Sequence, residues 1–127
     1  MKILLDTHAV LWFFDDDERL SKSAIEAIYN PENKKYVSIA TVWESAIKYS
    51  LGKLKLGGGI ENFIEVIYEN GFTLLEVDTE HIKVVTNLPF IHRDPFDRMI
   101  IAQAIVENMT IMTSDANVLK YDITHVW

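Results

Sequence analysis

The sequence of 127 residues contains no cysteine, and it has only five glycines and three prolines. The absence of cysteine excludes a disulfide scaffold, a zinc site built on thiolates and a cysteine nucleophile. No apolar run reaches the ~18 residues that a membrane-spanning helix needs, and the first residues lack the apolar core of a signal peptide. We therefore expect a soluble, cytoplasmic protein that makes no membrane contact.

Positive charge is also scarce in this sequence. There are 12 Lys and Arg residues against 19 Asp and Glu residues, which gives a formal net charge of -7. Nonspecific affinity for nucleic acids rests on Lys and Arg, so this balance argues against a generic basic nucleic-acid binder. The remaining composition is that of an ordinary globular protein, with 49% hydrophobic and 24% charged residues. The length predicts one domain over residues 1–127.

Short apolar runs alternate with segments of helical periodicity along the chain. Strands are predicted over 3–5, 36–39, 72–75, 110–113 and 122–126. Helices are predicted over 9–14, from Ser21 to Asn30, from Thr41 to Gly52, from Ile60 to Asn70, from Asp78 or Thr79 to Leu88, and over 95–108. Thr41 is expected to cap a helix with Glu44 in its first turn and Tyr49 facing the core. Strands that alternate with helices predict an α/β fold with parallel pairing and helices on both faces of the sheet.

Four carboxylates fall where a parallel sheet binds its ligands. Asp6 ends the first predicted strand, Asp115 follows the fourth, and Glu44 and Asp97 lie in early turns of helices. Ligands of open parallel sheets bind outside the carboxyl ends of the strands, so we expect these acids to converge on one edge. Such oxygen ligands favour Mg²⁺ or Mn²⁺ over zinc. A purely structural role stays open at this point, because such residues also cap helices and compensate helix dipoles.

An ordered series of motifs resembles a known family. The series comprises Asp6-Thr7-His8, Trp43-Glu44, Leu51-Gly52-Lys53-Leu54, the string His92-Arg93-Asp94-Pro95-Phe96-Asp97-Arg98 and Thr113-Ser114-Asp115. Over nearly the whole chain it resembles the PIN-domain ribonucleases, and among them the VapC-type toxins of toxin–antitoxin pairs. The resemblance implies a three-layer α/β/α sandwich with a short central parallel sheet. It also implies an endoribonuclease that uses one or two Mg²⁺ or Mn²⁺ ions, forms a homodimer and is inhibited by a cognate antitoxin.

The resemblance assigns roles to individual positions. Asp6, Glu44 and Asp97 match the family's core metal-binding acids, Asp115 matches a more variable fourth acid, and Thr7 and Thr113 match hydroxyl positions beside them. Asp94 is an additional carboxylate of the subgroup with the Asp-Pro-Phe-Asp-Arg string, and it is either a further metal ligand or the cap of the helix that begins at Pro95. These acids, by holding the metal, would activate a water molecule that hydrolyses an RNA phosphodiester bond.

Substrate binding in so acidic a protein must depend on a few local cations. Lys48 and Lys53 follow Glu44, although each also suits a solvated surface. Arg98, one residue beyond Asp97, is predicted to orient an acid or a phosphate. Among the histidines, only His8 is expected to support an acid, because it stands two residues from Asp6.

Three alternatives compete with the nuclease interpretation. A receiver domain needs a phosphoacceptor Asp at the end of a central strand, and residues 51–59 contain none. A phosphatase of the haloacid dehalogenase type needs a second Asp two residues after Asp6, where His8 stands. A noncatalytic PIN-like module that only binds a partner would be indicated by a missing acid, and the set is complete. The segment 54–59 and the apolar faces around Trp12 and Phe63 are candidate partner surfaces.

Overall fold

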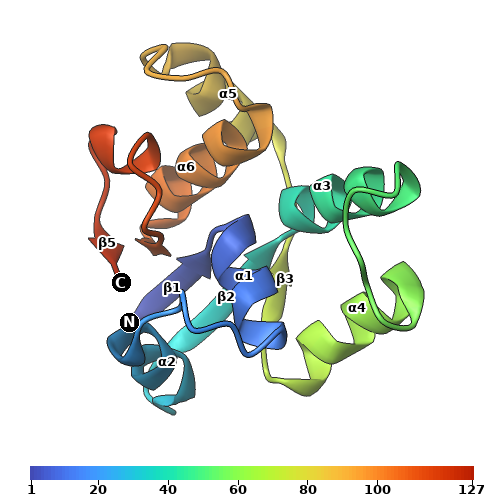
Figure 1. The fold of residues 1–127 in the computed structure, drawn as a ribbon. Helices are drawn as coiled ribbons and strands as arrows, with labels where there is room; N and C mark the ends of the chain where they lie inside the picture. Colours follow the sequence, from blue (N-terminus) through green and yellow to red (C-terminus); the bar gives the residue numbers. More distant parts are fainter.

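A computed structural model describes all residues, 1–127. Its centre is a sheet of five strands, β1 (Lys2–Leu5), β2 (Lys34–Ser38), β3 (Thr73–Leu75), β4 (Thr110–Met112) and β5 (His125–Val126). All neighbouring strands pair in parallel, in the order β3-β2-β1-β4-β5. The predicted α/β fold with a parallel sheet is therefore confirmed (Figure 1).

Six α-helices connect the strands. They are α1 (Thr7–Phe14), α2 (Lys22–Tyr29), α3 (Ile39–Ser50), α4 (Gly59–Glu69), α5 (Thr79–Asn87) and α6 (Pro95–Glu107), and the 3-10 turn η1 (Val118–Lys120) follows β4. The predicted cap Ser21 is confirmed, and of the two candidates Asp78 and Thr79 the cap is Asp78; the side chain of each cap accepts a main-chain N–H from the first turn of its helix. None of the helices has both the length and the apolar character needed to span a bilayer.

Two apolar cores lie on opposite faces of the sheet because side chains alternate along each strand. In β1, Ile3 and Leu5 point into a core shared with α1, α2 and α4, whereas Leu4 points into a second core shared with α6. Figure 1 shows these helices as separate layers, with α5 and α6 on one side of the sheet and α1, α2 and α4 on the other. The sheet is thus the middle layer of three.

The strand order reverses beside β1. The chain builds outward from β1 through β2 to β3, and then returns to place β4 and β5 on the other side. Connections from β1 and β4 therefore leave the carboxyl edge of the sheet in different directions, and open parallel sheets bind their ligands at such a reversal. Asp6 and Thr113 are the first residues beyond these two strands.

The beginning of α3 differs from the prediction. The helix starts at Ile39 and its cap is Ser38, whose hydroxyl accepts the Ala40 N–H at 3.0 Å. The expectation that Thr41 is the cap and that Glu44 lies in the first turn is wrong, because β2 runs into α3 without a connecting loop. Tyr49 is exposed and does not face the core.

Candidate active site at the carboxyl edge of the sheet

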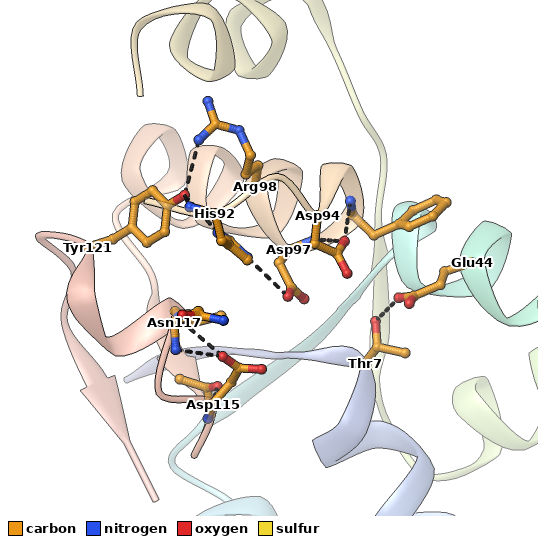
Figure 2. Close-up of polar contacts among 12 residues, drawn as sticks. Thr7, Glu44, His92, Asp94, Asp97, Arg98, Asp115, Asn117 and Tyr121 are labelled. Atoms are coloured by element: carbon orange, nitrogen blue, oxygen red, sulfur yellow. Dashed lines mark hydrogen bonds and ion pairs between the residues drawn. The ribbon is translucent and has the colours of Figure 1, made fainter. Parts of the chain in front are cut away.

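The structure brings the predicted acids to the carboxyl edge of the sheet. Asp6 directly follows β1. Figure 2 shows the other four: Asp115 comes after β4, Asp94 and Asp97 stand at the N-terminus of α6, and Glu44 projects from α3. They are close enough to interact, since the charges of the other three aspartates all raise the pKa of Asp97. One site therefore collects carboxylates from four separate stretches of sequence.

Asp6 is the most buried of these acids, with 5% of its surface exposed. Its main-chain N–H continues the sheet by donating to the Met112 carbonyl, and its Oδ1 accepts the Ala9 N–H at 2.8 Å, which caps α1. Burial raises the pKa of Asp6 because it removes water from the charged form, and nearby Asp115 adds to this. Hydrogen bonds from Thr113 and Ala9 oppose the shift.

Glu44 is 6% exposed and is held by two donors. Its Oε1 accepts the Thr7 hydroxyl at 2.7 Å, and its Oε2 accepts the Lys48 ammonium at 2.8 Å. Thr7 in turn lies 3.1 Å from the Thr41 hydroxyl, which links α1 to α3. The hydrogen bond with Glu44 raises the pKa of Lys48, and the charges of the two aspartates of α6 contribute to the same shift. Lys48 is therefore a cation next to the acids of the site.

Asp97 and Asp94 share the first turn of α6. Asp94 caps the helix, because its Oδ1 accepts the N–H groups of Phe96 and Asp97 at 2.9 and 3.1 Å. Asp97 is partly buried, with 19% of its side chain exposed. Burial raises the pKa of Asp97 to about 6, with the negative charge of Asp94 as the next cause, and a hydrogen bond from His92 counteracts it.

Asp115 caps the turn that leads into η1. Its Oδ1 accepts the N–H groups of Asn117 and Val118 at 2.8 and 3.2 Å. Its own N–H donates to the buried Thr113 hydroxyl at 3.0 Å. Thr113 also acts on Asp6, whose pKa its side chain lowers.

The Arg98 side chain does not contact the acids of the site, contrary to the prediction. Its guanidinium donates to the Pro89 carbonyl at 2.8 Å and to the carbonyls of Val85 and Leu88 at 3.3 Å, and it also reaches the Tyr121 hydroxyl at 3.0 Å. Figure 2 shows it on the side of α6 that faces away from the acids. The prediction that Arg98 orients an acid or a phosphate directly is wrong, because neighbouring residues of a helix point about 100° apart.

Two further predicted residues, Lys53 and His8, are exposed. Lys53 is exposed beyond the end of α3, and its side chain makes no hydrogen bond or ion pair with the acids. The exposed ring of His8 stacks on Trp12 at 5.3 Å, and its charge lowers the pKa of Asp6.

Sequence reasoning missed His92 and Tyr121. His92 Nε2 lies 3.3 Å from Asp97 Oδ2, and its Nδ1 lies 2.8 Å from the Tyr121 hydroxyl.

The donor set suits a hard divalent cation. Asp97 Oδ1 and the Oδ2 atoms of Asp94 and Asp115 accept no hydrogen bond from the protein. No three carboxylate or imidazole groups lie close enough to ligate one ion together. Mg²⁺ usually keeps several water ligands and takes only one or two carboxylates, so a pair of these acids suffices. Burial and the negative charges of the neighbouring aspartates raise the pKa of Asp97, and a bound cation would offset those charges. The residues present therefore fit a hydrated Mg²⁺ or Mn²⁺ ion.

Comparison with known proteins gives the family. The model of the PIN domain matches residues 3–123. The chain belongs to the PIN-domain family. Among curated protein sequences none matches the chain significantly. The match includes every acid of the site, so the acidic edge described above belongs to the PIN domain itself.

Solved structures show that this PIN domain has the fold of toxin–antitoxin proteins over nearly its full length. VapBC2 from Rickettsia felis, bound to a DNA fragment from its promoter, has 15% identity and a TM-score of 0.75, with 99% of this chain and 98% of that chain covered. VapBC-1 from nontypeable Haemophilus influenzae has 16% identity and a TM-score of 0.67, with 99% and 97% covered. A toxin–antitoxin complex from Klebsiella pneumoniae has 18% identity and a TM-score of 0.67, with 98% and 96% covered.

Proposed function

We propose that this PIN domain is a Mg²⁺- or Mn²⁺-dependent endoribonuclease that acts as the toxin of a toxin–antitoxin pair. The observation that carries the proposal is the gathering of Asp6, Asp97 and Asp115 at the point where the strand order reverses, with the pKa of Asp97 raised to about 6. A buried group of carboxylates is costly unless cations compensate it. Such a group inside a PIN domain supports a metal-dependent nuclease.

The acids have different roles in the proposed site. Asp6, Asp97 and Asp115 would ligate it in pairs, with Asp94 as a further candidate, and Glu44 completes the site from α3. When bound, a divalent ion lowers the pKa of a water and neutralises charge on the phosphoryl group. Because water is then the nucleophile, we expect RNA products with a 5′-phosphate and a 3′-hydroxyl.

Lys48 is the residue best placed to receive the RNA backbone. It is 45% exposed, lies within reach of three acids of the site and pairs with Glu44. A phosphate bound beside these acids would give the Lys48 ammonium a second anionic partner. The net charge of -7 predicts weak nonspecific affinity, so recognition depends on such local contacts and on the metal.

Two apolar grooves supply the surface that an antitoxin segment and a second copy of the chain would need. One, of about 180 Å³, lies between α1 and α4, where Phe14, Leu56 and Phe63 line it. The other, of about 470 Å³, lies between α3 and α6 and includes the exposed Trp43. The structural neighbours are toxin–antitoxin complexes, which supports an antitoxin partner and a cytoplasmic setting where RNA is available.

The test is cleavage of a defined RNA by the purified protein, with Asp6→Asn and Asp97→Asn as the altered forms. We expect cleavage that requires Mg²⁺ or Mn²⁺ and stops with EDTA. Each substitution should lower the rate by more than ~100-fold, because loss of a residue that only supports a ligand already costs ~10–100-fold. Asp122→Asn is the matched control, since Asp122 is exposed beside Asn108, the residue that ends α6 at the opposite edge of the sheet.

Two results would contradict the proposal. If the wild-type protein cleaves no RNA with either metal after any partner has been removed, the chain is a binding module rather than a nuclease. If cleavage occurs but both substituted proteins match Asp122→Asn, the chemistry does not use this site. End-labelled products that carry a 2′,3′-cyclic phosphate would show that the ribose hydroxyl, and not water, is the nucleophile.

A further inference from the structure

An unbroken series of polar contacts runs from the interior of the protein to Asp97. The Arg98 guanidinium donates to the Tyr121 hydroxyl at 3.0 Å, this hydroxyl lies 2.8 Å from His92 Nδ1, and His92 Nε2 lies 3.3 Å from Asp97 Oδ2. Figure 2 shows the four side chains in this order. Arg98 and Tyr121 are buried, whereas 19% of the Asp97 side chain is exposed, so the series connects the second core to the acidic site.

The hydrogen-bond donors around Tyr121 determine which nitrogen of His92 carries the proton. A phenolic oxygen has two lone pairs and one proton. The Tyr121 oxygen accepts two hydrogen bonds, one from the Arg98 guanidinium at 3.0 Å and one from the main-chain N–H of His92 at 3.4 Å. Both of these groups can only donate, so they occupy both lone pairs. Its proton is left for His92 Nδ1, which must therefore accept. The ring proton is then on Nε2, and it points at Asp97 Oδ2.

Arg98 is fixed firmly enough to impose this arrangement. It is 4% exposed, and its guanidinium donates to three carbonyls at and just beyond the C-terminus of α5. These carbonyls carry the partial negative charge of a helix C-terminus, so the buried cation needs no carboxylate partner. The ring of Phe90 lies against the other face of the guanidinium, with its centroid 4.4 Å from the guanidinium carbon. An arginine cannot become an acceptor, so its direction of donation is permanent.

We propose that His92 is a positioning residue that holds the carboxylate of Asp97 by donating Nε2–H to Oδ2, and that Tyr121 and Arg98 set its tautomer. The inference rests on the proposed function for its catalytic consequence. Oδ2 is then occupied and Oδ1 stays free for an ion or a water. Without this donor the carboxylate would turn away from the like charges of Asp94, Asp6 and Asp115, all of which act on it.

Substitution of His92 by Gln or by Asn distinguishes the roles of the two ring nitrogens. The amide nitrogen of His92→Gln reaches the place of Nε2 and can still donate to Asp97. The shorter side chain of His92→Asn ends near the place of Nδ1, so it reaches Tyr121 but not Asp97. We expect His92→Asn to lower kcat and Mn²⁺ affinity by ~10–100-fold, with KM for RNA little changed, and His92→Gln to retain most of both.

Tyr121→Phe tests the origin of the tautomer. In protein labelled with ¹⁵N at histidine, the wild-type His92 signals should report a proton on Nε2 alone, and Tyr121→Phe should give a mixture of tautomers. Its effect on kcat should vanish in the His92→Asn background, because Tyr121 acts only through His92. Thermal unfolding of each variant shows whether it is folded.

The outcomes separate the two proposals. A wild-type His92 with its proton on Nδ1 or on both nitrogens overturns the inference, and so do Asn and Gln variants with equal kcat and equal Mn²⁺ affinity. If the wild-type protein cleaves no RNA, the proposed function fails, but Mn²⁺ affinity measured by calorimetry still compares the two amides. A loss confined to His92→Asn in that measurement supports the positioning role without any catalytic assay.

Discussion

Asp6, Asp94 and Asp115 each use one carboxylate oxygen to hold a turn of the main chain. In every case Oδ1 accepts N–H groups of the residues that follow. The sequence left capping and metal ligation open as alternatives, yet a carboxylate has two oxygens and can serve both. Capping fixes the side-chain rotamer, and with it the direction in which the second oxygen points.

Asp97→Asn should make the metal-free protein more stable at pH 7.5. The pKa of Asp97 rises from 3.8 to about 6 on folding, so the folded state disfavours the charged form. At about 1.4 kcal/mol per pKa unit, removal of the charge should add at most about 3 kcal/mol to the free energy of unfolding. Urea denaturation in EDTA measures the change.

The sign of this effect can be checked through its pH dependence. The folded protein binds the extra proton between pH 3.8 and about 6, so the stability of the wild type falls as pH rises through this interval. The difference between Asp97→Asn and wild type should therefore be large at pH 7.5 and small at pH 4.5. A variant that is less stable than wild type at pH 7.5 would show that the charge of Asp97 is already compensated within the protein.

The start of α3 is held by a side-chain contact with α6. The Ser38 hydroxyl caps α3 and donates to Gln103 Oε1 at 2.5 Å, and Gln103 Nε2 donates to the Glu76 carbonyl at 3.2 Å. Ser38 and Gln103 are both fully buried. The contact therefore sets the position of α3 relative to α6, and with it the position of Glu44 relative to Asp97.

Ser38→Ala should lower the free energy of unfolding by about 2–4 kcal/mol. It removes a helix cap, which costs about 1 kcal/mol, and it leaves the buried Gln103 oxygen without a donor, which costs about 1–3 kcal/mol more. Ser50→Ala at the other end of α3 is the control, because the Ser50 hydroxyl is exposed and donates only to the Ile47 carbonyl. Urea denaturation that gives equal losses for the two variants would contradict the role of the contact.

The elements were more predictable from the sequence than their contacts. Apolar periodicity and caps such as Ser21 are local signals, and they located every strand and every α-helix to within a few residues, although not the 3-10 turn η1. Thr41 was misjudged because β2 passes directly into α3, so the cap is the last residue of a strand. Arg98 was misjudged because its sequence position beside Asp97 does not give the face of α6 on which it lies.

The contacts that refine the site join residues far apart in the chain. His92 and Tyr121 are separated by 29 positions, and Ser38 and Gln103 by 65. No periodicity or spacing signals such a pair in a single sequence. The convergence of the acids, by contrast, was predictable because the carboxyl ends of parallel strands must lie at one edge of the sheet.

The acidity of the whole molecule is partly concentrated at this edge. Five of its 19 acidic residues lie at the site, and burial raises the pKa of two of them, Asp6 and Asp97. The cost of burying these charges weakens the folded state, and a bound cation would offset it. A ligand that binds only the folded protein stabilises it in proportion to the logarithm of its concentration.

Mn²⁺ should therefore raise the melting temperature of the whole protein, and more at pH 7.5 than at pH 5. At 100 times the Kd the gain is about 2.7 kcal/mol, or roughly 10 °C for a chain of this length. At pH 5 a proton occupies Asp97, whose pKa is about 6, and competes with the ion. Asp97→Asn should lose both the shift and its pH dependence, and Asp122→Asn should keep them. Equal shifts at the two pH values would mean that the ion binds elsewhere, because a site that contains Asp97 cannot take up Mn²⁺ without releasing its proton.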